Sequence, residues 1–417
     1  MTNPDSVIVI GAGHIGLACA HYLARDGHDV TVIDQGEIGG ACSQANCGFL
    51  VPSHVLPLTT PDALPTALLS VLRPRAAFRV KPTLRAQTLH WMAQFGRRCT
   101  HRQMMRAARV LQEILDASMH EYDALLTDQS IDSERQCDGL LFVFRTERGL
   151  GRFADTDAML TQELGVTASY ITGDELPDVE PALREGLAGA YHYEHDGFLR
   201  PDRLNASWSA MLREQGVNFL ENCRLDRVSK GNGEIRGLAT SQGHMKADRY
   251  VFAMGAWSQR WSHDLECDIP IEPGKGYSVT MTRPGTMPSY PMLMPEKHIG
   301  VTPFEDNLRI ASMMEFAGFD TSIPAHRIRQ LQASAAPFLR EPVGPEIVDT
   351  WYGWRPMTWD SLPIIGRLPT VKNALIAAGH NMLGLTLAPV TGKLIADLVG
   401  ERRSELPLDA LSPERFH

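Results

Sequence analysis

The sequence predicts an α/β protein in which a doubly wound parallel sheet is joined to a second domain of antiparallel strands and helices. The main observation is the beginning of the chain, where the apolar run Val7–Ile10 leads through a glycine-rich turn into the apolar-patterned segment Leu17–Leu23. A second apolar run, Val30–Ile33, follows and ends at Asp34. A strand, a helix and a strand in this order are typical of a parallel βαβ unit. Farther along, short apolar segments such as Ile299–Pro303 predict antiparallel strands.

The turn after the first strand carries the G-x-G-x-x-G pattern of a dinucleotide-binding fold of the Rossmann type, formed by Gly11, Gly13 and Gly16. The first glycine makes the tight turn, the second lets the backbone approach a pyrophosphate, and the third lets the helix pack closely. The first helical turn, which includes Ile15, offers free N–H groups and the positive end of the helix dipole to the phosphates. Asp34 lies 18 residues after Gly16, near the roughly 20 expected for the acid that binds a ribose 2′-hydroxyl. This context favours a nucleotide site over an ordinary glycine-rich turn and disfavours NADP.

Composition limits the class of protein. A chain of 417 residues is long enough for two or three domains, and a net charge of −9 argues against a nucleic-acid partner. Seven cysteines without a regular framework predict reduced thiols and a cytoplasmic location. The first strand begins at Val7, so no signal peptide is expected, and no apolar run has the length of a membrane span. His90, His101 and His120 lack metal-ligand spacing, so no metal is expected.

Two further segments rich in small residues are expected to contact the dinucleotide. The loop 35–48 follows directly on the ribose acid, and its expected contacts are Gln35, Ser43, Asn46 and Gly48; the alternative is a plain surface loop. Farther along, an apolar strand is followed by a turn that contains Gly255 and Trp257. No second G-x-G-x-x-G motif occurs in the chain. One tightly bound dinucleotide, FAD, is therefore expected rather than NAD.

The stretch Val51–Leu84 is rich in proline and leucine, and the prolines prevent long helices. Leu64–Leu72 is a short apolar helix candidate with basic residues after it. Apolar residues beside basic ones are typical of contact with a membrane surface, but a helix packed in the second domain with a solvated basic flank explains the pattern equally well.

The order of motifs resembles the FAD-dependent D-amino-acid oxidase superfamily over nearly the whole chain. The stretches that carry the resemblance are GAGHIG, SQANCG, ADRYVFAMGAWS, PGKGYS, YGWRPMTWDSLPIIG and AAGHNMLGLTLAPVTGKLIADL. Within the superfamily, the insert KPTLRAQTLHWMAQFGRRC and the PGKGYS stretch resemble bacterial D-amino-acid dehydrogenases of the small-subunit type. The final segment also resembles glycine and sarcosine oxidases.

Three residues are candidates for the reacting part of the site, and the resemblance implies a substrate contact for the first. The arginine of the G-x-R-P strand, Arg355, is expected to bind the substrate carboxylate, because a guanidinium is a planar two-pronged donor that matches it; the alternative is a structural salt bridge. Tyr277 shares a face with Lys275 in an extended segment, and it either donates to the same carboxylate or is a packed strand tyrosine. His380 either contacts the flavin ring or caps the loop that follows it.

The resemblance also completes the set of cofactor residues and the domain boundaries. FAD is expected to contact Gly353 and the residues before the last helix, Gly384, Leu385 and Thr386. The FAD is expected to be non-covalent, because no cysteine lies in Gly353–Thr358, where sarcosine oxidases tether theirs. The FAD-binding domain is expected to comprise residues 1–54, 171–265 and 350–417, and the substrate-binding domain residues 55–170 and 266–349.

The sequence thus predicts an FAD-dependent amino-acid dehydrogenase that oxidatively deaminates D-amino acids, cyclic imino acids such as D-proline or hydroxy-D-proline included. A hydride passes to flavin N5, and a quinone-type or other non-oxygen acceptor takes the electrons, for an enzyme in the cytoplasm or on the inner face of the membrane. Two alternatives stay open: a glycine or sarcosine oxidase that produces hydrogen peroxide, and a flavin-holding subunit of a larger complex. A homo- or hetero-oligomer stays open as well.

Overall fold

A parallel sheet forms the first layer of the structure. The computed structural model describes residues 5–63, 65, 76–81, 85–128 and 131–416. Among these residues, a six-stranded sheet has the order β19-β20-β13-β1-β2-β9. Its strands are β1 (Ser6–Ile10), β2 (Asp29–Ile33), β9 (Asn218–Leu220), β13 (Arg249–Phe252), β19 (Ile364–Arg367) and β20 (Ala374–Ala378). Neighbouring strands are parallel except β19, which is antiparallel to β20.

Both faces of this sheet are buried, as expected for a parallel sheet. Val7 and Val9 of β1 belong to the core cluster that includes helices α1 (His14–Arg25) and α9 (Ala388–Val399). Ile8 and Ile10 point to the other face and pack in a second cluster with an antiparallel sheet of β10 (Leu225–Gly231), β11 (Glu234–Thr240) and β12 (Gly243–Met245). The predicted strand–helix–strand unit is therefore present, with a small sheet in place of helices on its second face.

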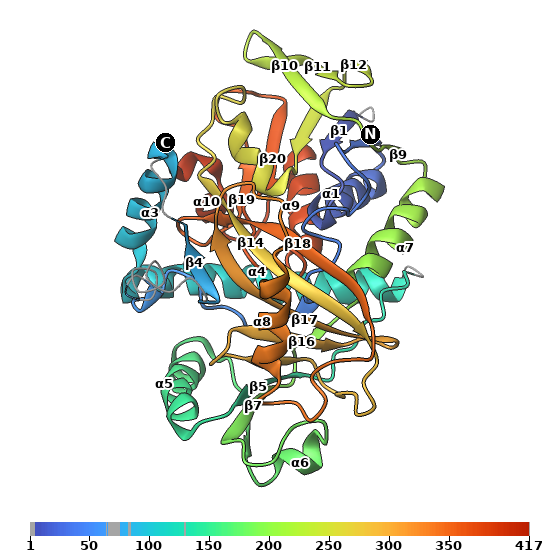
Figure 1. The fold of residues 1–417 in the computed structure, drawn as a ribbon. Coiled ribbons are helices and arrows are strands. Elements are labelled where there is room, and N and C mark those ends of the chain that lie inside the picture. Colours follow the sequence, from blue (N-terminus) through green and yellow to red (C-terminus); the bar gives the residue numbers. More distant parts are fainter. Residues whose placement is uncertain (1–4, 64, 66–75, 82–84, 129–130, 417) are drawn as a thin grey trace.

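Helices α1 and α9 lie against each other, and glycine makes their close approach possible. A Cβ atom on Gly392 of α9 would overlap the carbonyl oxygen of Ala18 in α1. Both helices are almost fully buried. The pair positions the N-terminus of α1 and the loop before α9 at the same edge of the sheet (Figure 1).

The second sheet is larger and mixed. It is nine-stranded, in the order β18-β14-β17-β16-β15-β5-β7-β6, and β4 pairs with β17. Its strands are β4 (Phe78–Val80), β5 (Leu140–Phe144), β6 (Ser169–Thr172), β7 (Gly189–Tyr193), β14 (Ile271–Thr282), β15 (Met292–Met294), β16 (Ile299–Pro303), β17 (Asn307–Phe316) and β18 (Ile347–Thr358). The long strands β14, β17 and β18 run between the parallel sheet and the far end, where β5, β7 and α5 lie (Figure 1). They connect the two halves of the molecule.

The remaining elements surround these sheets. They are β3 (Phe49–Leu50) paired with β8 (Gly197–Phe198), α3 (Ala86–Arg98), α4 (His101–Asp128), α5 (Glu147–Leu164), α6 (Leu176–Val179), α7 (Pro201–Glu214), the 3-10 helix η1 (Gly255–Trp261), α8 (Ala325–Ala335), α10 (Leu408–Leu411) and the 3-10 helix η2 (Pro413–Phe416). Strands β6, β7 and β18 overlap the ranges predicted for the FAD-binding domain, yet they pair within the nine-stranded sheet. The division of the chain into two domains stays a prediction.

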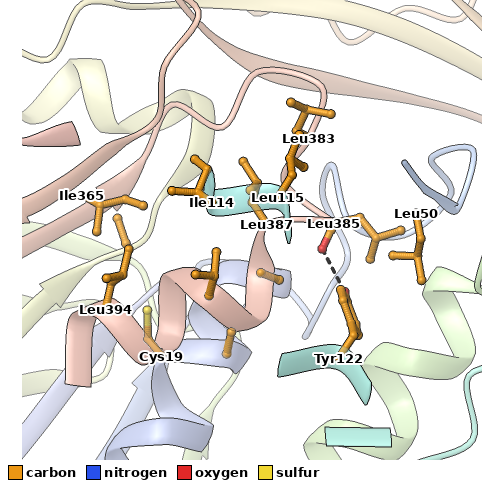
Figure 2. Packing of buried hydrophobic residues seen from close by; sticks show 14 of the residues in the cluster. Cys19, Leu50, Ile114, Leu115, Tyr122, Ile365, Leu383, Leu385, Leu387 and Leu394 are labelled. Atoms are coloured by element: carbon orange, nitrogen blue, oxygen red, sulfur yellow. Dashed lines mark hydrogen bonds between the residues drawn. The ribbon is translucent and has the colours of Figure 1, made fainter. Parts of the chain in front are cut away.

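Helix α4 turns one apolar face to the core, because apolar residues recur along it at spacings of three and four. Leu111, Leu115 and Tyr122 are buried, and they pack around the loop before α9. The hydroxyl of Tyr122 donates to the carbonyl of Leu385 at 2.8 Å, as Figure 2 shows. Ser118 donates to the carbonyl of Thr386 at 2.6 Å. The stripe is therefore core, and it fixes the backbone of this loop from behind.

Candidate functional site

One large cavity lies where the carboxyl ends of the parallel strands meet the nine-stranded sheet. Its volume is about 870 Å³, near the upper end of the roughly 300–1,000 Å³ of small-molecule sites. Its walls come from both sheets and from the loops after β1, β2, β13 and β20. The predicted site residues that line it are Gly11, Gly13, Ile15, Asp34, Gln35, Ser43, Asn46, Gly255, Trp257, Arg355, His380, Gly384 and Leu385.

The glycine turn has the geometry that its sequence predicts. Gly11 has a φ of +114°, and a Cβ there would overlap the carbonyl oxygen of Ala253. A Cβ on Gly16 would overlap the carbonyl oxygen of Gly11, so this glycine lets α1 approach the strand. Gly13 lines the cavity at the start of α1, whose first turn holds no acidic side chain. A phosphate therefore meets a helix N-terminus without a competing negative charge.

Asp34 lines the cavity and also holds the glycine turn. Its Oδ2 accepts the N–H of Ala12 at 2.7 Å, and its Oδ1 accepts the N–H of Gly36 at 2.8 Å. Burial raises the pKa of this carboxyl, and the two backbone bonds oppose the rise. Each carboxylate oxygen has a further lone pair, so the carboxylate is able to accept ribose hydroxyls while it keeps both backbone contacts.

Four predicted cofactor residues lie outside the cavity wall and have structural roles. Gly16 packs α1, as described above. Gly48 has a φ of +77° and lies against the carbonyl of Leu199, where a Cβ would overlap. Gly353 faces the ring of Trp351. The hydroxyl of Thr386 donates to the carbonyl of Phe49 at 3.3 Å. These four residues fix the conformation of loops in which adjacent residues line the cavity.

Arg355 lines the cavity. Its Nη1 donates to the carbonyl of Met313 on β17 at 2.7 Å. Gly276 of β14 leaves the space that the guanidinium occupies, since a Cβ there would overlap Nη1. Within the described chain, Arg355 forms no ion pair with a carboxylate, and burial lowers the pKa of its guanidinium. An enclosed cation without an anionic neighbour is a binding site for an anion.

Tyr277 lies on the opposite face of β14 from Arg355. Arg355 pairs with Gly274 across the β14–β18 ladder, and side chains alternate along a strand, so the even-numbered residues of this part of β14 share its face. The hydroxyl of Tyr277 donates to Glu315 at 2.7 Å, and the amino group of Lys275 lies 5.0 Å from the tyrosine ring. The shared face of Tyr277 and Lys275 is present, but it points away from the cavity. A substrate contact for Tyr277 therefore has no geometric support.

His380 lines the cavity and contacts α9. Its Nε2 lies 2.9 Å from Oγ1 of Thr391, and that hydroxyl donates its own proton to the carbonyl of Leu387 at 2.7 Å. The hydrogen-bond network thus assigns the N–H to Nε2. Burial lowers the pKa of His380 to about 3, so the imidazole is neutral. Its hydrogen bond to Thr391 holds the beginning of the loop 381–387 against α9. This agrees with the prediction that His380 caps the loop that follows it.

Three residues that line the cavity have no role predicted from the sequence. Cys42 and Cys47, the second of which lies in the SQANCG stretch, line it close to Arg355. His54 lines it as well, beyond the predicted cofactor loop. The preceding residue, Ser53, is held by Asp196, whose two oxygens accept its N–H at 3.0 Å and its O–H at 2.5 Å. The only sequence signal for His54 is its position a few residues after the cofactor loop, because the contact with Asp196 spans 143 positions.

The helix candidate Leu64–Leu72, predicted either to contact a membrane or to pack in the second domain, lies almost entirely outside the described residues. Three basic residues of its flank are described: Arg79 lies 3.8 Å from Glu315, Lys81 lies 2.9 Å from Asp320, and Arg85 precedes α3. In the described parts of the chain, no helix is long and apolar enough to cross a membrane. No cluster of metal-ligating side chains is found there either.

Comparisons with known proteins agree with this geometry. The sequence profile of the family described as DAO, FAD dependent oxidoreductase, matches residues 6–398. A D-amino acid dehydrogenase of Vibrio atlanticus (strain LGP32) is 32% identical over 424 residues, which cover 98% of this chain and 99% of that protein.

Solved structures show the same fold. Glycine oxidase from Geobacillus kaustophilus is 24% identical with a TM-score of 0.76, over 99% of this chain and 98% of that one. L-proline dehydrogenase from P. horikoshii is 22% identical with a TM-score of 0.72, over 100% and 98%. The predicted superfamily and the predicted mixed α/β fold are confirmed.

Replacing Asp34 is expected to weaken FAD binding. Asp34→Ala removes the ribose acceptor and the two backbone contacts, so the FAD-to-protein ratio should fall about tenfold or more at limiting FAD. Asp34→Asn keeps one acceptor oxygen and should lose less. The measurement is flavin absorbance against protein concentration, with circular dichroism as the control for folding. Full FAD occupancy in Asp34→Ala would refute the ribose assignment.

Acid precipitation should release all flavin, because no tether is expected.

Asp196 should give stability a defined pH dependence. Burial raises the pKa of its carboxyl to about 7, against about 3.9 in an unfolded chain. Between about pH 4 and pH 7 the folded protein keeps a proton that the unfolded chain has lost, so the free energy of unfolding falls as pH rises. Asp196→Asn has no titrating proton. Its amide oxygen can accept the N–H of Ser53, and its amide N–H can donate to the hydroxyl of Ser53.

Urea unfolding at pH 5 and pH 8 therefore should show Asp196→Asn gaining stability relative to the unaltered protein at the higher pH. The matched control is Asp174→Asn, at an exposed carboxylate in the turn before α6, which should change little between the two pH values. Equal pH dependence in Asp196→Asn and the unaltered protein would contradict the assignment.

Proposed function

The chain belongs to the DAO family of FAD-dependent oxidoreductases, and we propose on this premise that it oxidatively deaminates D-amino acids. The observation that carries the proposal is the guanidinium of Arg355, which lines the cavity and forms no ion pair with the described residues. The curated relative named D-amino acid dehydrogenase, 32% identical over nearly the full length of both chains, supports the choice of substrate. Cyclic imino acids such as D-proline stay within the proposal, because an imino acid carries the same α-carboxylate.

Arg355 has the donors that a carboxylate needs. One N–H of Nη1 is used by the carbonyl of Met313, and a guanidinium has five N–H donors. The contact with Met313 fixes the plane of the guanidinium, so the two-pronged bond to a carboxylate has one orientation. The same bond fixes the α-carbon, and a shift of about 1 Å in a reacting atom costs on the order of 100-fold in rate.

The other side chains of the site position the cofactor and exclude water. When bound, FAD supplies the two-electron acceptor for the hydride of the α-carbon. Gly11, Gly13 and Asp34 hold its nucleotide half, as argued above. His380 fastens the loop that contains Gly384 and Leu385 to α9, and Tyr122 holds this loop from behind. These two hydrogen bonds therefore fix the loop that would line the flavin.

Fewer observations bear on the electron acceptor than on the substrate. We propose a quinone-type or other non-oxygen acceptor, which the printed name of the relative, a dehydrogenase, supports. A glycine or sarcosine oxidase is the alternative, since the fold is shared with glycine oxidases. An oxidase and a dehydrogenase differ in the rate at which oxygen reoxidises the reduced flavin, which is followed by the return of flavin absorbance in air. A purely flavin-holding subunit has no use for an unpaired arginine in the cavity.

Arg355 variants test the substrate anchor. Arg355→Lys keeps the charge but loses the fork, so the half-saturating substrate concentration should rise strongly. Arg355→Ala loses about 1.5–3 kcal/mol of binding and should also reduce its flavin on the order of 100-fold more slowly. The measurement is anaerobic stopped-flow flavin reduction across concentrations of D-alanine or D-proline.

FAD content should be unchanged in both variants. Arg236→Ala, on the exposed side of β11, is the matched control and should behave as the unaltered protein does. If Arg355→Ala reduces its flavin at the original rate and concentration dependence, the carboxylate anchor lies elsewhere. If it purifies without colour, Arg355 has a structural role instead.

A further inference from the structure

The cavity wall beyond the cofactor loop contains several apolar side chains beside the imidazole of His54. Phe49, Phe142 and Leu293 line this part of the cavity together with His54. The rings of His54 and Phe142 have centroids 5.8 Å apart. The wall lies on the strands β3, β5 and β15; β5 and β15 are neighbours inside the nine-stranded sheet, and β3 pairs with β8. It is therefore separate from the glycine turn and Asp34, which bind the nucleotide.

His54 also lies beside the part of the site that surrounds Arg355. A small void of about 20 Å³ next to the cavity is bordered by His54, Met357, Met382 and Leu383. Met357 is two residues from Arg355 on β18, and Met382 and Leu383 follow His380. The imidazole thus borders both this void and the cavity that Arg355 lines.

The imidazole of His54 uses neither ring nitrogen within the protein. Nδ1 is enclosed and has no hydrogen-bond partner, and Nε2 forms no hydrogen bond with any described residue. Nδ1 is enclosed by protein atoms and Nε2 is not, so Nε2 is the atom that a ligand reaches. Burial lowers the pKa of His54 to about 4, so the ring is neutral. A neutral imidazole offers one donor and one acceptor, and leaving them unused in an apolar wall is unfavourable.

The backbone around His54 is fixed independently of its ring. Ser53 is held by Asp196, Val55 is fully buried, and the N–H of Val51 donates to Thr386 at 3.3 Å. A phenylalanine or leucine would fill the same apolar wall without an unpaired polar group. The fold therefore does not need an imidazole at this position. We expect the imidazole to serve a ligand that enters the cavity.

We propose that His54 is a specificity-determining residue that hydrogen-bonds a hydroxyl group on the side chain of the substrate. The inference rests on the proposed function, since Arg355 holds the carboxylate and the side chain extends toward the aromatic wall. A hydroxyl both donates and accepts, so it pairs with either tautomer of the neutral ring. The preferred substrates are thus apolar amino acids that carry one hydroxyl.

Matched substrates test the proposal. The pairs are D-threonine and D-allo-threonine against D-valine, and D-tyrosine against D-phenylalanine, each compared by the second-order rate constant of anaerobic flavin reduction. In the unaltered protein the hydroxylated member of at least one pair should be favoured about tenfold, the size of one neutral hydrogen bond. His54→Phe should abolish that preference. His54→Asn, which keeps a donor and an acceptor, should retain part of it.

The controls separate structural damage from lost recognition. His101→Phe makes the same change at an exposed position at the start of α4 and should keep the full preference. FAD content should stay unchanged in all variants. If His54→Phe binds FAD fully and shows the same ratios as the unaltered protein, or if the unaltered protein shows no preference in any pair, the proposal is overturned.

A binding measurement tests hydroxyl recognition by His54 without turnover. The probes are 3-hydroxybutanoate and 3-methylbutanoate, two unreactive carboxylates of similar shape, and the readout is the change in flavin absorbance on binding. The unaltered protein should bind the hydroxylated probe about tenfold more tightly, and His54→Phe should bind both equally. Equal binding in the unaltered protein overturns the role of His54. Absence of reduction by every D-amino acid, with the binding preference intact, overturns the proposed function alone.

Discussion

A cation held in an enclosed cavity without a carboxylate partner is the constraint on which the rest of the site depends. The guanidinium of Arg355 is kept in place by a neutral carbonyl, that of Met313, and by the space that Gly276 leaves. Burial disfavours the charged form and lowers its pKa, so the empty site is electrostatically unfavourable, and an anionic ligand relieves it. The adjacent long strands β14, β17 and β18 supply all three residues, which explains why the nine-stranded sheet extends to the parallel sheet.

The cofactor side of the cavity depends on rigid supports behind it. The loop before α9 lines the cavity with Gly384 and Leu385, but its position is set by α4 through Tyr122 and by α9 through Thr391. The glycine turn is held in the same way, because Asp34 binds its backbone from the cavity side. Both supports lie behind one cavity, which Asp34, Leu385 and Arg355 line together.

Local patterns could be predicted from the sequence, and properties set by strand register could not. The turn from Gly11 to Gly16, Asp34 and the buried stripe of α4 follow from spacing within one segment. Arg355 was found through a motif, and the structure places it in the cavity. For Tyr277 the sequence leaves a carboxylate contact and a packed strand position equally open, because its face depends on how β14 pairs with β18. His54 carries no motif, since its place is set by Asp196 and Phe142, far away in sequence.

The most direct test of the account compares a substrate with the same molecule lacking its carboxylate. FAD-loaded protein is mixed without oxygen with D-alanine, L-alanine, glycine, sarcosine or ethylamine, and the flavin absorbance is followed. The account predicts rapid bleaching by D-alanine, much slower bleaching by the other three carboxylates, and none by ethylamine, which has no group for Arg355 to hold. Bleaching by ethylamine at the rate of D-alanine would contradict the carboxylate anchor, and bleaching by glycine or sarcosine alone would contradict the D-amino-acid substrate.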